Sequence, residues 1–222
     1  MKIFIIIKEN SERVPKKNFR LLNNIPLWKH LVHELSDHEV FIDTDSKKVL
    51  SDCAGLPWVV AYQREQRFID YEEYNELNLS PALMMIDNFL DNYVEDENEI
   101  IVTTHVTSPF LKIDTILSAV EILEKDTSYD SIHSVTSHQE FSWLGPNMSP
   151  INFDPSVIQR TQDLPVITMS NGSFSIFRKR MFKKLNNRIG ENPYYYTLNG
   201  PESIEIDTIE DFNLADIVIR GL

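Results

Sequence analysis

The chain has 222 residues, enough for one α/β domain with a sizeable core, and 42% of them are hydrophobic, which excludes an intrinsically disordered protein. The net charge of −13 argues against non-specific nucleic-acid binding, and no apolar run approaches the roughly 20 residues that cross a bilayer. The single cysteine, Cys53, excludes an internal disulfide framework and a Cys-rich zinc site. Together these absences predict a cytoplasmic protein that binds neither nucleic acid nor membrane.

The first half of the chain alternates predicted strands with predicted helices. Residues 3–7 form an uninterrupted apolar run, which is typical of a strand buried on both faces. The polar segment 8–24 contains Pro15 and predicts a long loop, and Pro26 then opens a helix with leucines at a spacing of four. The other elements expected in this half are a strand over 40–42, a helix from Ser46, a strand over 58–61, a helix from an N-capping Ser80 to about Asn92, and a strand over 100–104.

The second half is less regular. An amphipathic helix over 113–125 precedes an expected strand over 131–135, and a strand over 173–177 and a helix from Thr208 follow later. Residues 137–165 lack clean periodicity and are rich in Pro, Ser and aromatic side chains. We expect residues 1–222 to form a single domain, with 137–165 as an inserted lobe or a dimerisation arm.

This order of elements predicts an α/β fold with a mostly parallel sheet and helices on both faces. Ligands of such sheets bind beyond the carboxyl ends of the strands. Three polar clusters fall there, namely the segment from Lys8 onward, residues 43–45 and residues 105–109.

The basic segment at the start stands out from an acidic chain. Residues 1–20 carry six Lys and Arg side chains against two Glu, although the protein as a whole is strongly negative. A small polyanion such as a triphosphate needs several cations and backbone N–H groups that converge on it. The alternative is a solvated basic loop, and charge alone does not decide between the two.

Residues 8–18 read K-E-N-S-E-R-V-P-K-K-N, and they resemble the signature loop of acylneuraminate cytidylyltransferases, roughly A-R-G-G-S-K-R-I-P-G-K-N. Lys8 stands where the family has Arg, and Glu9, Asn10 and Lys16 replace glycines. The resemblance implies that Lys8 and Lys17 hold the triphosphate as catalytic residues. It also implies that Asn18 helps to bind the nucleotide, with Ser11 and Arg13 as further loop contacts.

Four more segments resemble the same family in the same order. They are residues 41–45 (V-S-T-D in the family), 105–110 (Q-P-T-S-P-L), 160–165 with 171–172 (R-x-Q-D-L-P, then N-G-A), and 204–211 (I-D-I-D-T-x-E-D). The five ordered matches span residues 8–211. They imply a Rossmann-like nucleotidyltransferase fold with a small inserted dimerisation lobe, and a homodimer.

Further substrate contacts are implied at Arg64, Ser80, His105, Gln162 and Asn171. His105 replaces the family's Gln that contacts the acidic sugar, and its alternative is a packed histidine at a strand end. Ser80 is equally well explained as a helix N-cap. Three tyrosines at 194–196 favour packing, and His133 and His138 show no partner pattern.

Glu205 and Asp207 are the predicted metal ligands. Residues two apart on a strand point the same way, so both carboxylates reach one site, and Mg²⁺ is usually held by one or two carboxylates plus phosphate oxygens. The family has Asp at both positions and uses Mg²⁺ or Mn²⁺ there. The alternative is that Asp207 caps the last helix, while Thr208 and Asp211 have the form of a capping box.

Residues 43–45 (D-T-D) also match the metal-binding D-x-D of glycosyltransferases, although a helix cap by Asp45 or Ser46 is the favoured interpretation. The family resemblance implies an enzyme that transfers CMP from CTP to an acidic sugar, a sialic acid-like 2-keto-3-deoxy sugar acid, and releases pyrophosphate. The alternatives are a cytidylyltransferase for a phosphonate or other small acid, and a catalytically inactive nucleotide-binding relative.

Overall fold

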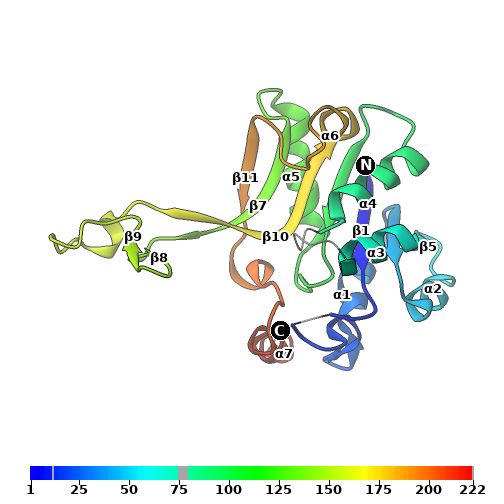
Figure 1. Ribbon diagram of the computed structural model, residues 1–222, viewed down its shortest axis with the longest axis horizontal. Helices are drawn as coiled ribbons and strands as arrows, with labels where there is room; N and C mark the ends of the chain where they lie inside the picture. Colours follow the sequence, from blue (N-terminus) through cyan, green and yellow to red (C-terminus); the bar gives the residue numbers. More distant parts are fainter. Residues whose placement is uncertain (12, 75–79, 222) are drawn as a thin grey trace.

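A computed structural model describes residues 1–11, 13–74 and 80–221. Its centre is a seven-stranded sheet in the order β11-β7-β10-β6-β1-β4-β5 (Figure 1). All neighbouring strands are parallel except β10, which runs antiparallel to both β6 and β7. The strands are β1 (Lys2–Ile7), β4 (Val40–Thr44), β5 (Val59–Gln63), β6 (Ile100–Thr104), β7 (Ser131–His138), β10 (Ile167–Arg178) and β11 (Pro193–Thr197). The prediction of a mostly parallel sheet is confirmed.

Helices cover both faces of this sheet, as predicted. The helices are α1 (Leu27–Glu34), α2 (Lys47–Cys53), α3 (Gln66–Tyr74), α4 (Ala82–Tyr93), α5 (Ile113–Lys125), α6 (Lys179–Leu185) and α7 (Ile209–Gly221). One core cluster packs α1, α2 and α5 against one face, and a second packs α3, α4 and α6 against the other. Because both faces are covered, β1 is apolar from Ile3 to Ile7, which explains the uninterrupted run in its sequence.

A third, smaller cluster holds α7 below the carboxyl ends of the strands. It joins Phe212 and Ala215 of α7 to Leu22 of the short hairpin β2 (Leu21–Leu22) and β3 (Ile25–Pro26), and to Ile206. This packing brings the segment that precedes α7 beside the loop that follows β1.

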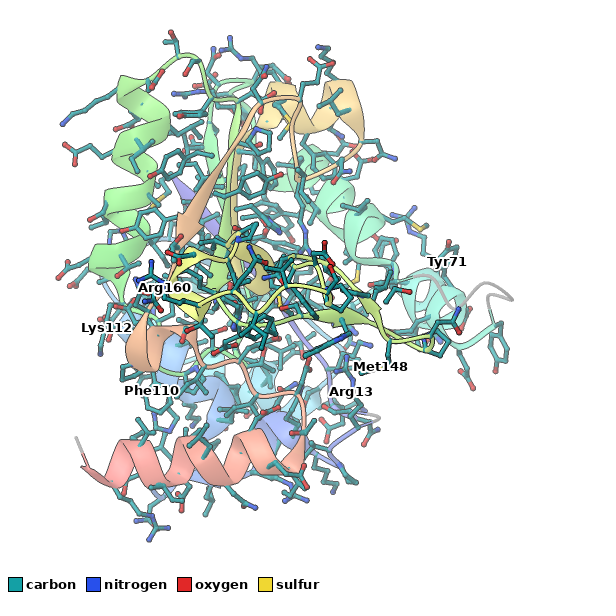
Figure 2. All side chains as sticks on the ribbon, turned by 90° about the vertical axis from the view of Figure 1, so that its left-hand side faces the viewer. Arg13, Tyr71, Phe110, Lys112, Met148 and Arg160 are labelled. Carbon is teal, nitrogen blue, oxygen red and sulfur yellow. The ribbon has the colours of Figure 1, made fainter. Side chains whose placement is uncertain are left out.

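Beyond the sheet, β7 and β10 continue as a pair and carry residues 139–166 away from the body of the molecule as an arm (Figure 1). The arm contains the short strands β8 (Trp143–Leu144) and β9 (Ser149–Pro150). Buried Asn152 ties it together, because its side chain bonds Ser142 N, Glu140 O and Pro165 O at 2.9–3.0 Å. Figure 2 looks along the arm, which bears Met148 and Arg160.

Most predicted elements are confirmed, and the bounds of α5 match the prediction. The helices α3 and α6 and the strand β11 were missed, as were the short strands β2, β3, β8 and β9. The expected start of α4 is one residue early, because Pro81 occupies the N-cap position; Ser80 Oγ still accepts the Ala82 N–H at 3.2 Å. Tyr194 and Tyr196 pack against the core, as expected, while Tyr195 is exposed.

Within the described residues, every helix falls short of the length and apolar character required to cross a membrane.

Candidate active site

A cleft of 560 Å³ opens at the carboxyl ends of β1 and β6. It lies between the loop after β1, the start of α4 and the segment before α7. It is lined by Ile6, Lys8, Ser11, Arg13, Lys17, Asn18, Glu72, Ser80, Pro81, Ala82, Met85, His105, Val106, Thr107 and Asp207. The structure therefore brings most of the predicted site residues together at one place.

The loop after β1 is anchored by its backbone and buried groups. Asn18 Nδ2 donates to Lys8 O at 2.9 Å, Glu9 N donates to Asp45 Oδ1 at 2.6 Å, and Val14 is buried. Among the described residues, Asn18 Oδ1 is one of few buried polar atoms without a hydrogen-bond partner. A buried acceptor without a partner is energetically costly, so this oxygen is suited to accept a hydrogen bond from a ligand in the cleft.

Asp207 joins this loop to the end of the chain. Arg13 Nη1 lies 2.8 Å from Asp207 Oδ2, and Lys17 Nζ lies 3.2 Å from Asp207 Oδ1. Lys17 also donates to Ile206 O at 2.7 Å and is nearly buried. Two cations on one carboxylate place positive charge in the cleft at fixed positions.

Glu205 lies close to Asp207 and is half-buried. Thr107 Oγ1 donates to Glu205 Oε1 at 3.2 Å, and burial, followed by repulsion from Asp207, raises the pKa of Glu205. Two carboxylates that disfavour each other's charge fit a divalent cation whose remaining ligands are phosphate oxygens and water. In the described part of the chain, groups of three or more His, Cys, Asp or Glu side chains suited to a metal do not occur.

The last helix is capped by Thr208 and Asp211, as the capping box predicts. Asp211 N donates to Thr208 Oγ1 at 3.2 Å, and Asp211 Oδ2 accepts from Thr208 N at 2.8 Å and from Asp207 N at 3.0 Å. The Asp207 carboxylate therefore takes no part in the cap and faces the cleft. The capping interpretation of Asp207 is wrong in this structure.

Lys8 is paired with Glu72, which also lines the cleft. Glu72 lies in α3, so its place in the site was missed along with that helix. Thr107 was also missed as an individual residue, although it lies inside the segment 105–110 that carries the family resemblance. The role of the Thr107 hydroxyl can be recognised only from the structure, in which it donates to Glu205.

Arg64 lies outside the cleft lining. Its side chain is buried, with Nε 2.7 Å from Asp43 Oδ1 and Nη2 3.2 Å from Ile7 O. Asp43 is likewise buried in this pair, which removes it from the D-x-D type of metal site. Ser46 caps α2 by accepting from Val49 N at 3.4 Å, so the capping interpretation of this segment is confirmed.

Ser80 and His105 both line the cleft. Burial, then the charges of Arg188 and Lys17, lower the pKa of His105 to about 4. The imidazole is therefore neutral near pH 7, where it can donate one hydrogen bond and accept another.

The structure does not bring Gln162 and Asn171 into the cleft lining. Gln162 is exposed on the arm, where Gln139 Nε2 donates to its backbone oxygen at 3.0 Å. Asn171 lies at an irregularity in the pairing of β10 with β7, and its Nδ2 is buried without a partner among the described residues. The next residue, Gly172, has φ 72°, and a Cβ added there would lie 3.9 Å from Glu205 Oε1, so this turn approaches the carboxylate pair.

The fold is similar to solved structures of nucleotide-dependent enzymes. One is a CMP:2-keto-3-deoxy-manno-octonic acid synthetase complexed with CTP (TM-score 0.67, 13% identity, 99% of this chain and 98% of that chain). Another is the 2-C-methyl-D-erythritol 4-phosphate cytidylyltransferase of Francisella tularensis (TM-score 0.65, 14% identity, 97% and 98%). At these identities the likeness establishes the fold.

The sequence is similar to curated relatives over nearly its whole length. It is 26% identical to N-acylneuraminate cytidylyltransferase A of Danio rerio, over 96% of this chain and 49% of the relative. It is 29% identical to CMP-N,N'-diacetyllegionaminic acid synthase of Legionella pneumophila, over 90% and 76%. The chain thus spans about half the length of the fish relatives it matches. Residues 4–218 match the family model described as Cytidylyltransferase, and the chain belongs to that family.

Proposed function

We propose that this chain is an enzyme that transfers CMP from CTP to an acidic sugar, a sialic acid-like 2-keto-3-deoxy sugar acid, and releases pyrophosphate. The observation that carries the proposal is the convergence of Arg13 and Lys17 on Asp207, beside Glu205, in an open cleft at the carboxyl edge of the sheet. Cations next to a carboxylate pair suit a triphosphate that arrives with a divalent ion. The names of the curated relatives support the same substrate class.

In the proposed reaction a hydroxyl of the acceptor attacks the α-phosphorus of CTP. A new phosphorus–oxygen bond forms, the bond to the bridging oxygen of the β-phosphate breaks, pyrophosphate leaves and the hydroxyl proton is released. Lys8, Arg13 and Lys17 would hold the phosphates and offset their growing charge, so that positioning and electrostatics supply most of the rate enhancement. The phosphates compete with Glu72 and Asp207 for these cations.

Mg²⁺, or Mn²⁺ in its place, is the proposed cofactor, with Glu205 and Asp207 as its protein ligands. When bound, such an ion neutralises phosphate charge and orients the phosphate oxygens. The raised pKa of Glu205 supports this assignment, because a nearby dication relieves the repulsion between the two carboxylates.

The test is pyrophosphate release from CTP and Mg²⁺ with N-acetylneuraminate, N,N'-diacetyllegionaminate, 2-keto-3-deoxy-manno-octonate and a set of small phosphonates. We expect release with one sugar acid. Asp207→Asn should abolish it, whereas Asp211→Asn, which alters the neighbouring cap, should retain it. Release only with a phosphonate would show that the acceptor is a phosphonate and not a sugar acid. CTP binding without any release would favour the inactive relative, and a protein that does not bind CTP contradicts the proposal.

The exposed apolar surface of the arm supports the proposal that the protein is a homodimer. Its large apolar side chains are exposed, notably Trp143, Leu144, Met148, Ile151, Val157, Ile158, Val166 and Met169. An exposed apolar surface of this kind is typical of an interface. The arm also carries Arg160 and Gln162 away from the cleft of their own chain, so these residues would serve the cleft of a second copy.

Sedimentation equilibrium tests the homodimer. We expect two copies per particle for the unmodified chain, and one copy for Leu144→Asp on the arm. Leu214→Asp on α7 is the matched control, because Leu214 is also exposed but lies outside the arm. A monomeric unmodified chain, or a dimer unaffected by Leu144→Asp, contradicts the assignment of the arm.

A further inference from the structure

A polar strip crosses the sheet face that is otherwise packed by α3, α4 and α6. Phe177 of β10 belongs to the core on this face, whereas Ile176 belongs to the core on the opposite face. Because side chains alternate along a strand, Ser175 shares the face of Phe177. Ser175 Oγ lies 2.7 Å from His133 Nδ1, and His133 Nε2 lies 3.0 Å from Ser170 Oγ. Polar groups therefore replace the apolar core beyond the end of α6.

Arg188 lies on the loop that follows α6, and its charge acts on His133 of this strip. Asn186 ends the helix in the left-handed conformation, and Gly190 N then donates to Ser131 Oγ at 2.8 Å. Glu191 N and Asn192 N donate to the Asp130 carboxylate at 2.7 and 3.1 Å, which fixes the loop against the start of β7. The loop is tight, because a Cβ at Gly190 would lie 2.0 Å from Asp130.

The guanidinium of Arg188 has no counter-ion in the described part of the chain. Burial lowers the pKa of Arg188, and no charged partner offsets that effect. Every other non-exposed Lys or Arg among the described residues makes an ion pair or donates to a carbonyl, as Lys17, Arg64 and Lys179 do. A partly buried guanidinium without a carboxylate is costly unless a ligand supplies the negative charge.

Arg188 is not among the residues that line the cleft, but its charge reaches both the polar strip and a cleft residue. Its charge acts on both His133 and His105, and His105 lines the cleft. Both imidazoles are neutral near pH 7, so the positive charge that acts on His133 is that of Arg188, while His105 lies within reach of both Arg188 and Lys17. Asn171 Nδ2, in the irregular part of β10 beside Ser170, is a second donor that is buried without an acceptor. Two donors that lack acceptors favour an anionic or strongly accepting ligand.

We propose that Arg188 is a specificity-determining residue that binds the carboxylate of the acceptor from within the same chain, with His105 and Asn171 as neighbouring hydrogen-bonding groups. This inference rests on the proposed function and deepens it, because it assigns the acidic group of the acceptor to a named cation. The phosphate-binding cations Lys8, Arg13 and Lys17 lie on the loop after β1, so the two anions of the reaction have separate sites.

Binding to the intact protein tests this inference in two steps. The first step measures CTP affinity with Mg²⁺ and no acceptor, for the unmodified chain, Arg188→Gln, Arg188→Lys and Arg180→Gln. Arg180 is the matched control, because it lies on α6, the helix that precedes the Arg188 loop, but is exposed. We expect equal CTP affinity throughout, which also shows that the variants fold.

The second step titrates the three sugar acids, and the methyl ester of each, into protein saturated with CMP. Arg188→Gln should weaken binding of an acid by about 10- to 100-fold, since a charge-assisted hydrogen bond to a carboxylate is lost. Arg188→Lys should restore part of the affinity, Arg180→Gln should have no effect, and ester binding should be insensitive to all three changes.

The outcomes separate the two proposals. An acid affinity that Arg188→Gln leaves unchanged, or an equal loss for acid and ester, overturns the role of Arg188. An unmodified chain that binds CTP but none of the acids also overturns it, while CTP binding stands. An unmodified chain that does not bind CTP overturns the proposed function itself.

Discussion

Lys17 and Asp207 meet in the cleft from opposite ends of the chain. Lys17 Nζ lies 3.2 Å from Asp207 Oδ1 and also donates to Ile206 O at 2.7 Å, so the ammonium group is held by a carboxylate and a carbonyl together. Lys17 is nearly buried, which limits the number of positions that its side chain can adopt. The positive charge is therefore in place before any phosphate arrives.

Replacing Lys17 should impair catalysis far more than replacing its neighbour. Lys17→Gln removes a pre-positioned charge, and we expect kcat/KM for CTP to fall by about 100-fold. Lys16→Gln is the matched control, because Lys16 is adjacent but exposed, and it should change kcat/KM by no more than about threefold. The measurement is initial-rate pyrophosphate release at several CTP concentrations. Equal effects of the two changes would show that the loop acts only through its total charge.

The parts of the fold that sequence reasoning predicts correctly have local signals. The apolar run of β1 and the amphipathic pattern of α5 identify these elements without knowledge of their partners. By contrast, α3 is short, contributes only Phe68 to the buried core and carries four charged residues among its nine, so its apolar pattern is weak. The strand β11 depends on pairing with β7, a long-range contact that leaves no local pattern.

The same distinction applies to the site. The loop residues 8–18 are adjacent in sequence, so their convergence follows from one motif at one strand end. The partner of Lys8 is Glu72, which belongs to the helix that was missed. Arg188 carries no motif, and it stands out only once the structure shows that it is partly buried without a carboxylate partner among the described residues.

Removal of the Glu205 charge should weaken metal binding without lowering the stability of the folded protein. Because burial and Asp207 raise its pKa, ionised Glu205 lowers the stability of the folded state at pH 7, where the group is ionised in the unfolded chain as well. Glu205→Gln should therefore leave Tm unchanged or higher without metal. It should also raise the Mg²⁺ concentration for half-maximal activity by about tenfold. Thermal unfolding and a Mg²⁺ titration measure the two effects.

The control for this change is Glu210→Gln, which removes an exposed carboxylate a few residues later. It should alter neither Tm nor the Mg²⁺ requirement. A Mg²⁺ requirement that Glu205→Gln leaves unchanged would exclude Glu205 as a ligand, and Asp207 would then be the remaining protein ligand.

Arg64 should prove to be a structural residue. Arg64→Met leaves the buried Asp43 carboxylate without its partner at 2.7 Å, and breaking a buried pair in this way costs about 3–5 kcal/mol of unfolding free energy. The double change Asp43→Asn with Arg64→Met removes the stranded charge and should recover part of that loss. Urea unfolding followed by circular dichroism measures the free energy of unfolding.

The matched control for Arg64 is Arg67→Met, because Arg67 is exposed and pairs with Glu65 at the surface. Its effect should stay within about 0.5 kcal/mol. If Arg64→Met instead keeps full stability but weakens CTP binding, Arg64 contacts the substrate, as the family resemblance implies.

His133 should make stability depend on pH between about 4 and 6.5. Burial, and then the charge of Arg188, lower the pKa of His133 to about 4, whereas a histidine of the unfolded chain titrates near 6.5. The unfolded state therefore binds more protons in this window, and the free energy of unfolding falls as the pH falls through it.

His133→Gln keeps hydrogen-bonding groups for Ser170 and Ser175 but cannot gain a proton. We expect the variant to lose less stability than the unmodified chain between pH 6.5 and pH 4, by about 2 kcal/mol. Carboxylates such as Asp43 and Glu205, whose raised pKa values give the opposite slope, are common to both proteins and cancel in this comparison. Urea unfolding at a series of pH values measures the difference. Parallel curves for the two proteins would mean that His133 is protonated as readily in the folded state as in the unfolded chain, which contradicts the prediction.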